Sequence, residues 1–492
     1  MMDRNDGTQQ KLLCVTLESL MPERHFLRDL DRMMDFSFIY SKVEGLYSHT
    51  GRRSIDPVVV VKMLLLGYLY GIDSERRLEQ EIQVNIAYRW FLGIDLDEPV
   101  PDHSTLSQLR RRKFQGTAIF EEIFTEIVRR CISRGLISGK LLLMDSTHVR
   151  ANARNDLTER RIVDVEPSAY LQRLNEEAER EGFYPKHKNG ERELTGRREV
   201  KVSKTDPESG FMNRPGKPPG FHYLSHQTCD AEHGLITDVF VTPGNENDAP
   251  AASCRIQHQI NAFGFEPEAV CADRAYDSAE LHHDMLLLGI KTYIPRQASH
   301  EKEPGGRFSD RDFRYDKDND RVICPAGETL RFSSYNPKTG SKRYSARNTV
   351  CSKCSLREKC LAGKMKRREI HRACHKWAAE EQHEKNDGTP QYHAALRLRK
   401  IWCEGNFSHQ KALHNLRRTR KRGLSRAFEH CLLSAAAFNL KRMVRLLTAR
   451  PGYTKGRRID RYDMLRVLRK LRARFLRVCQ RGQIWTFLSF VK

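Results

Sequence analysis

The sequence has no apolar run long enough to cross a lipid bilayer. Its longest candidate, residues 58–66, is interrupted by Lys62, whereas a membrane-spanning helix needs about 20 consecutive apolar residues. The opening residues, MMDRNDGTQQ, lack the basic and then apolar layout of a secretory signal peptide. We therefore expect a cytoplasmic protein, with no membrane among its partners.

Acidic residues are scarce in the C-terminal part of the chain. From residue 405 to the end, 23 Lys and Arg face only three acids, a net charge of +20 out of +23 for the whole sequence. A localised positive field of this size favours a polyanionic partner, and nucleic acid is the most common one. The alternative is a solvated basic surface or a ribosome-like tail.

Disulfides are not expected among the 13 cysteines, because the sequence carries no export signal. The C-x2-C spacing of Cys351 and Cys354 is typical of a metal knuckle, and tetrahedral zinc takes four sulfur or nitrogen ligands. The candidate ligands of a structural zinc are Cys324, Cys351, Cys354 and Cys360, with His371 or Cys374 as substitutes. Four reduced thiols in a turn-rich segment are the alternative.

A chain of 492 residues is too long for one compact core, so we expect several modules. The first, residues 1–135, is predicted to be a helical DNA-binding domain. Asp56-Pro57 starts one helix, Ser74 caps a second that continues to about residue 93, and Asp102 or Ser104 starts a third. The basic residues of this third helix resemble those of a helix-turn-helix reader, although any small helical bundle has a similar pattern. They are Arg110, Arg111 and Arg112.

An α/β core is predicted to follow. Apolar or alternating runs predict strands near 141–149, 222–231, 235–242, 268–272 and 291–295, with a helix near 278–288. Residues 136–296 form its first part, in which the charged stretch 155–220 is expected to be an exposed insertion or long loop. Residues 297–370 are a cysteine-bearing insertion, 371–448 complete the core with a helix, and 449–492 are a basic tail.

Three acids stand out within this core. Asp145 follows Leu-Leu-Leu-Met and Asp273 follows Val-Cys-Ala, and an acid in an apolar strand is costly unless it is paired or binds metal. For either residue alone, a cap on the next turn is an adequate explanation. Together with Glu404 on a helix in basic surroundings, the set can hold two Mg²⁺ or Mn²⁺ ions for phosphodiester displacement.

The segments around these acids resemble bacterial insertion-sequence transposases with a DDE triad. They are MDSTHVRANA, CADRAYDS and CEGNFSHQKALHNLRRTRKRG, and the front, GRRSIDPVVVVKMLLLGYLYGI, is similar to the N-terminal domain of that family. The resemblance covers roughly residues 15–445. It implies an RNase H-like mixed-sheet core with an N-terminal helical domain. It also implies Asp145, Asp273 and Glu404 as catalytic metal ligands.

The same resemblance implies that Lys411, in the family's Glu-x6-Lys spacing, contacts a DNA phosphate; a plain surface lysine is the alternative. Many relatives have an Arg four residues before the Glu, where this chain has Lys400, and a Tyr where it has Arg397. Further candidate phosphate-binding residues are Arg417, Arg418, Arg420, Lys421 and Arg422. His148, Arg274 and Tyr276 flank the acids and are candidates for tuning the site.

The sequence thus predicts a nucleoid-associated DNA transposase that binds element ends and target as double-stranded DNA, acting as a homodimer. The alternatives are a DNA-binding regulator without catalysis, an inactivated copy, or a nuclease that only hydrolyses. The regulator predicts that replacing Asp145 or Glu404 changes nothing. The nuclease predicts cutting without attack by a 3′ hydroxyl on a second duplex.

Overall fold

The computed structural model describes residues 15–47, 50, 54–165, 168–183, 196–214, 218–247, 249–297 and 306–449. The chain divides into two units, residues 1–442 and 443–492. All of the predicted basic tail beyond residue 449 lies outside the described residues.

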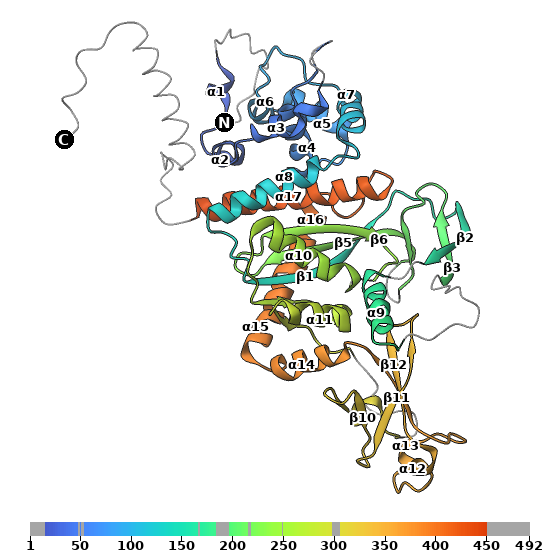
Figure 1. Cartoon of the computed structure of the whole chain (residues 1–492). Helices are drawn as coiled ribbons and strands as arrows, with labels where there is room; N and C mark the ends of the chain where they lie inside the picture. The colour runs from blue at the N-terminus through green and yellow to red at the C-terminus, as the bar shows by residue number, and fades with distance from the viewer. Residues whose placement is uncertain are drawn as a thin grey trace, which may run out of the picture. The chain divides into compact units, whose positions relative to one another are not determined.

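The N-terminal part is helical, as expected (Figure 1). Asp56 caps its longest early helix by accepting from Val58 N, with Pro57 at the first helical position. Asp102, rather than Ser104, is the cap of the later helix. The elements are α1 (Leu17–Leu20), α2 (Phe26–Met33), α3 (Phe38–Val43), η1 (Glu44–Leu46), α4 (Pro57–Leu69), α5 (Glu75–Val84), α6 (Ile86–Leu92), α7 (His103–Leu109), η2 (Arg110–Phe114) and α8 (Ile119–Ser133).

The single helix predicted from Ser74 to about residue 93 is two helices. Asn85 ends α5 and also begins α6, where its side chain accepts from Tyr88 N. The apolar spacing continues across this break, which is why the pattern alone predicted one helix. An asparagine in extended conformation supplies the missing cap.

The larger sheet carries the predicted core strands. Its order is β6-β5-β1-β7-β8, with short β4 on the same edge of β5 as β6. β5 is antiparallel to β1 and β6, whereas β1, β7 and β8 run parallel. The strands are β1 (Leu141–Arg150), β4 (Gly210–Met212), β5 (Gly220–Asp230), β6 (Ile236–Pro243), β7 (Ala269–Cys271) and β8 (Lys291–Tyr293).

Helices cover both faces of this sheet. Cys229 on β5 packs in one apolar cluster with Ala395 of α15. Its neighbour Thr228 is hydrogen-bonded to Gln259 of α10, and consecutive strand residues point to opposite faces. The helices of the core, outside the stretch 155–220 and the cysteine-bearing insertion, are η3 (Ala249–Ala251), α10 (Ala252–Phe263), η4 (Arg274–Tyr276), α11 (Ala279–Leu287), α14 (Lys376–Asn386), α15 (Pro390–Arg399), η6 (Lys400–Glu404), α16 (Gly405–Leu413) and α17 (Leu424–Thr448).

The cysteine-bearing insertion contains a second sheet of antiparallel strands in the order β13-β12-β11-β10-β9. Its last strand ends at Ala373, just beyond the expected boundary of the insertion. Val322, Leu330 and Tyr344 form its buried centre. The elements are η5 (Asp310–Asp312), β9 (Arg314–Asp316), β10 (Arg321–Ile323), β11 (Thr329–Asn336), β12 (Ser341–Ser345), α12 (Asn348–Ser352), α13 (Arg357–Cys360) and β13 (Glu369–Ala373).

The stretch 155–220, expected to be an exposed insertion or long loop, contains regular structure, so the long-loop alternative was wrong. β2 (Thr158–Val165) pairs with β3 (Gly196–Ser203), and α9 (Ala169–Arg180) lies between them in the chain. Asn175 of α9 accepts from the Tyr335 hydroxyl at 2.7 Å and donates to the Pro337 carbonyl. The charged composition concealed this helix because the residues that bury it come much later in the sequence.

None of the helices in the described ranges combines the length and apolarity that a bilayer-spanning helix requires.

Candidate active site

Asp145 lies within β1, half-buried between its own backbone and a helix. Its Oδ1 accepts from Ser146 N at 2.8 Å, and its Oδ2 lies 2.8 Å from Nη1 of Arg399. The exposed fraction is 15% for the Asp145 side chain and 16% for that of Arg399. The carboxylate is therefore held on the face of the sheet that α15 covers.

Asp273 follows β7 and is the cap of η4, where its Oδ1 accepts from Ala275 N at 2.9 Å. β1 and β7 are parallel neighbours, with Leu143 opposite Cys271. Asp145 and Asp273 each follow that pair by two residues, so the register brings both to the same level of adjacent chain segments. Each of the two sequence-predicted acids therefore lies two residues beyond Leu143 or Cys271, the last paired residues of the two parallel strands.

Glu404 is exposed on a helix that continues through α15, η6 and α16, residues 390–413. η6 is a π-helical turn, in which the hydrogen bonds span five residues instead of four. Ala395 and Cys403 pack against Leu143 and Cys271 of the sheet, which places the Glu404 region over the strands that lead to the two aspartates.

Arg399 is the residue that sequence reasoning missed. It precedes Glu404 by five residues and pairs with Asp145, whereas Lys400, predicted to contact DNA from the family's spacing, is exposed. Burial lowers the pKa of the Arg399 guanidinium, but Asp145 and, more weakly, Asp273 raise it overall. The π-turn adds one residue to the helix, so the arginine five residues before Glu404, and not the lysine four residues before it, faces Asp145. An arginine at a spacing of five residues was the signal in the sequence that could have identified Arg399.

Lys411 reaches the same strand two residues further along. Its Nζ lies 2.6 Å from Oγ1 of Thr147. Asp145 and Thr147 are alternate residues of β1 and therefore share a face. Arg399 and Lys411, on one helix, thus bring two cations to Asp145 and Thr147, which are alternate residues of β1.

The other predicted DNA-contacting cations differ in their surroundings. Arg110 and Lys421 are only 13% and 15% exposed in their side chains, and both are paired with Glu429. Burial lowers the pKa of the Lys421 ammonium, while Glu429 acts in the opposite direction. Arg420 is exposed and paired with Asp73 at 2.7 Å. Exposed side chains are found at Arg111, Arg112, Arg417, Arg418 and Arg422.

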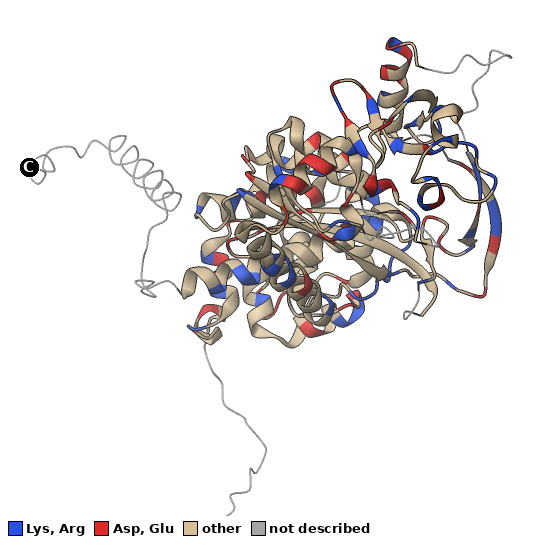
Figure 2. Ribbon diagram, turned by 90° about the horizontal axis from the view of Figure 1, so that it is seen from below, with Lys and Arg blue, Asp and Glu red and all other residues tan. Residues whose placement is uncertain are grey.

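Lys and Arg are interspersed with Asp and Glu along the described ribbon, as Figure 2 shows. The sequence gives the same result, because the first 404 residues carry only +3 of the net charge. The cations near β1 are therefore a local arrangement, not part of a uniformly basic face.

Asp277 anchors the loop that follows Asp273. Its Oδ1 accepts from Nε2 of His282 and from Nε2 of His383, each at 2.9 Å, and Gln297 N donates to its Oδ2. Burial raises the pKa of Asp277, but these hydrogen bonds outweigh it and hold the pKa well below its usual range. The loop is thus tied to α11 and α14.

Two groups of three candidate metal-ligating side chains have their ligand atoms within 4.8 Å of one another in the described chain. They are Asp277, His282 and His383, and Glu79, Asp102 and His103. The three predicted catalytic acids are not such a group. The register relates Asp145 to Asp273 through the pair Leu143 and Cys271, and Glu404 follows Cys403, which packs against that pair.

The four predicted zinc ligands line one pocket beside the smaller sheet; they are Cys324, Cys351, Cys354 and Cys360. Leu356 N donates to Sγ of Cys354 at 3.4 Å. Burial raises the pKa of the Cys360 thiol, and the three other cysteines raise it further. Their sulfurs are not gathered within 4.8 Å as the groups above are. His371 and Cys374, the proposed substitutes, do not line this pocket.

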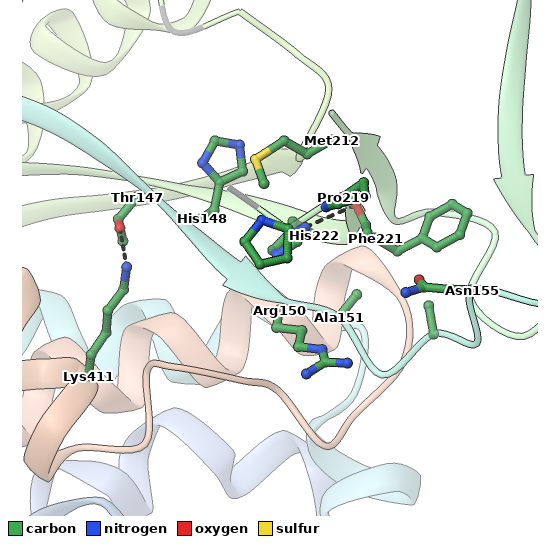
Figure 3. A pocket seen from close by; sticks show the side chains of 13 residues that line it. Thr147, His148, Arg150, Ala151, Asn155, Met212, Pro219, Phe221, His222 and Lys411 are labelled. Carbon is green, nitrogen blue, oxygen red and sulfur yellow. Dashed lines mark hydrogen bonds between the residues drawn. The ribbon is translucent and has the colours of Figure 1, made fainter. Parts of the chain in front are cut away.

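The three residues predicted to tune the site, His148, Arg274 and Tyr276, have different surroundings. Tyr276 is buried, with 1% of its surface exposed, and Arg274 is exposed. His148 lines a cavity beside β1 (Figure 3), where its Nε2 donates to the Gly244 carbonyl at 3.2 Å.

Comparison with known proteins identifies two regions. Residues 15–112 match the family model described as a transposase domain (DUF772), and residues 323–444 match the one described as a transposase DDE domain. Both matched regions are thus of the transposase class. More narrowly, the two matches support an insertion-sequence DDE transposase, and the family predicted from the motifs is confirmed.

Solved structures give more distant likenesses. A cryo-EM structure of the piggyBac transposase synaptic complex with hairpin DNA is 11% identical, with 94% of this chain and 83% of that chain covered and a TM-score of 0.35. The crystal structure of the Mos1 strand transfer complex is 9% identical over 51% of this chain and 61% of that chain, with a TM-score of 0.16. No curated protein matches the chain.

Proposed function

We propose that this chain is a DDE transposase that cuts DNA at element ends and joins them to a target, with Asp145, Asp273 and Glu404 as catalytic residues. The observation that carries the proposal is the parallel register of β1 and β7, which brings Asp145 and Asp273 to one level beneath the helix that bears Glu404. The strand order, in which β1 lies between antiparallel β5 and parallel β7 and β8 follows β7, supports an RNase H-like core.

The donor set fits hard divalent cations. Carboxylate oxygens are what Mg²⁺ and Mn²⁺ prefer, and transposases of the DDE class typically use a divalent metal. Asp145 and Asp273 would hold two ions jointly with Glu404. Bound metal would supply charge stabilisation for the attacking and leaving oxygens of the phosphodiester.

The chain's own residues would position the DNA. Arg399 and Lys411 place two cations on either side of the Glu404 position along one helix, and each reaches β1. Such a pair can hold the phosphate backbone across the acids. The helical region at residues 15–135 would recognise the element's ends, and two copies of the chain would bring two ends together on the chromosome.

The test is strand transfer by the full-length protein, with Mg²⁺, on labelled DNA that carries the element's ends. Wild type should cut and then use the new 3′ hydroxyl to attack a second duplex. Asp145→Ala, Asp273→Ala and Glu404→Ala should each bind that DNA and lose both steps by at least about 100-fold, the scale for removing a group that stabilises a transition state.

Asp318→Ala is the matched control, because Asp318 is an exposed acid in a turn of the smaller sheet. If the three variants join DNA as well as the control does, the acids are structural and the proposal fails. Cutting without joining would favour the hydrolytic nuclease. Binding without cutting by wild type would favour the regulator or an inactivated copy.

The cysteine pocket stays a prediction as a structural zinc site. All four cysteines line it, which supports the prediction, while their spacing exceeds that of a closed ligand set. Metal analysis of the purified protein should give one zinc per chain, lost in Cys351→Ser and retained in Cys254→Ser, an exposed cysteine elsewhere.

A further inference from the structure

Three side chains from separate elements converge at the end of the loop that carries Asp273. Asp277 follows η4, His282 lies on α11 and His383 lies on α14. Nε2 of each histidine lies 2.9 Å from the same atom, Oδ1 of Asp277. Their ligand atoms all lie within 4.8 Å of one another. Two imidazole nitrogens and one carboxylate oxygen thus face one point.

This group is almost entirely withdrawn from solvent. The exposed fraction of the side chain is 0% for His282, 7% for His383 and 13% for Asp277. Burial of so many polar groups is costly unless they are paired or bind a cation. The other described group of candidate ligands is more open, since the side chain of its His103 is 31% exposed.

Each histidine is oriented through its other ring nitrogen. Nδ1 of His282 lies 2.7 Å from Oγ1 of Thr292, and Nδ1 of His383 lies 3.1 Å from Oδ1 of Asp387. Histidines that bind metal ions make such a second contact in almost all sites, because it fixes the ring with the free nitrogen toward the ion. Both rings are therefore held from behind as metal ligands are.

The three ligand atoms are slightly closer together than they would be around a metal ion. A tetrahedral ion with bonds of about 2.1 Å holds its ligand atoms about 3.4 Å apart, so each nitrogen would move about 0.5 Å away from Asp277. Gln297 N donates to Oδ2 of Asp277 at 2.7 Å, which leaves Oδ1 as the ligand. Three protein ligands leave the fourth position to water.

We propose that Asp277, His282 and His383 bind one first-row divalent cation of the zinc and cobalt class, at a site separate from the candidate catalytic acids. Imidazole nitrogen favours these ions, whereas a set made only of carboxylates favours Mg²⁺. The bound cation would tie the loop after Asp273 to α11 and α14. The inference does not depend on the proposed function.

Protons compete with the cation at this site, because a ring nitrogen that donates to Asp277 cannot bind metal at the same time. In the metal-free protein the three side chains keep the hydrogen bonds described above. Only three side chains would hold the ion, so protein treated with chelator should lose it and retain a zinc held by four cysteines. The cation is therefore expected only when it is supplied.

The test adds Co²⁺ to full-length, chelator-treated protein in excess Mg²⁺, which fills sites made only of oxygen. His383→Gln and Asp277→Asn should each lose one Co²⁺ per chain, together with its visible absorption. The lost spectrum should lack the near-ultraviolet band that sulfur ligands add. His393→Gln, at an exposed position of α15, is the matched control and should bind as wild type does.

Thr292 offers a finer test, because it touches the site only through His282. Thr292→Val should weaken Co²⁺ binding about tenfold, the scale for losing a partner that orients a metal ligand. Thr292→Ser keeps the hydroxyl and should bind Co²⁺ within about twofold of wild type. A merely structural role of Thr292 would change the stability in these variants without this difference in affinity.

Amide hydrogen exchange locates the ion in the wild-type protein, without any substitution. Zn²⁺, added in excess Mg²⁺, should slow exchange severalfold in residues 274–297 and in α14, and leave residues 54–135 unchanged. If wild type shows no such protection, or if Co²⁺ binding survives in both His383→Gln and Asp277→Asn, the proposal is wrong. Loss of binding in His103→Gln instead would assign the ion to the other group. Strand transfer with Mg²⁺ alone tests the proposed function separately.

Discussion

Arg399 supplies the positive charge that faces Asp145 before any metal arrives. In Arg399→Ala a divalent cation would meet less repulsion at the acids, so the Mg²⁺ concentration for half-maximal joining should fall severalfold. The maximal rate should also fall, because Asp145 loses a contact that orients it. Both are read from joining rates across a Mg²⁺ titration.

Arg397→Ala is the control for this change, because Arg397 is exposed two residues earlier on the same helix. A higher Mg²⁺ requirement in Arg399→Ala than in Arg397→Ala would contradict the assigned role.

For individual residues, the sequence could predict the candidate acids but not the side chains with which charged residues form ion pairs. Asp145 and Asp273 each follow a run of apolar residues, a local pattern that can be seen without a structure. That Arg110 and Lys421 are paired with Glu429 could not be predicted, because Glu429 lies on a helix far along the chain from Arg110. Nor could Arg399, since its position depends on one extra residue in a helical turn.

That turn is itself a testable element. An α-helix advances about 100° per residue, so residues five apart would face directions about 140° apart. The π-turn at Lys400–Glu404 absorbs one residue, which leaves Arg399 toward Asp145. Deletion of Ile401, an exposed residue of this turn, should restore a regular helix with the same faces on both sides and keep joining within about threefold.

Insertion of one alanine after Ile401 should instead rotate one half of the helix against the other and abolish joining. Circular dichroism should confirm that both variants are folded. If deletion and insertion are equally harmful, the phase of the helix is not what positions Arg399.

The loop that carries Asp273 is held by an ion pair that responds to pH. Burial lowers the pKa of His383 from 6.5, but hydrogen bonds to Asp277 and Asp387 outweigh this and raise it. The stability that protonated His383 contributes to the fold is therefore complete below about pH 6.5, and it is lost as the pH rises through the raised pKa. The depressed pKa of Asp277 means that its own share is present above about pH 3.8 and lost in stronger acid.

His383→Gln should accordingly lower the free energy of unfolding by roughly 1–3 kcal/mol at pH 5.5, with the difference narrowing toward pH 8.5. Urea unfolding at a series of pH values measures this, with His393→Gln, at an exposed position of α15, as the reference. A difference that grows with pH would show that the neutral ring, not the cation, stabilises the loop.

For the whole molecule, the sequence predicted the order of regions better than their contacts. Helical spacing in residues 57–69 and the apolar strands of the core are local signals, and both are present in the structure. The pairing of α9 with the smaller sheet joins segments 160 residues apart, as in the contact between Asn175 and Tyr335. No local pattern encodes such a contact, so the stretch 155–220 was predicted only to be an exposed insertion or long loop.

The concentration of positive charge in the C-terminal residues of the sequence leads to the last prediction. Residues 450–492 contain 13 Lys and Arg and two acids. Each phosphate that a cation neutralises contributes about 0.9 to the slope of log affinity against log salt. Deletion of these residues should therefore weaken binding to any duplex and flatten that slope by several units, as measured by titration of DNA between 50 and 300 mM salt.

A full-length variant with these Lys and Arg changed to Gln distinguishes charge from chain length, and it should behave as the deletion does. The position of the cut should not change in either variant, because both variants keep the proposed catalytic residues Asp145 and Asp273. If the deletion left the slope unaltered, the phosphate contacts would have to come from residues before 450, among which Arg111, Arg112, Arg417 and Arg418 are exposed. Neutralising those four would then produce the loss expected of the tail.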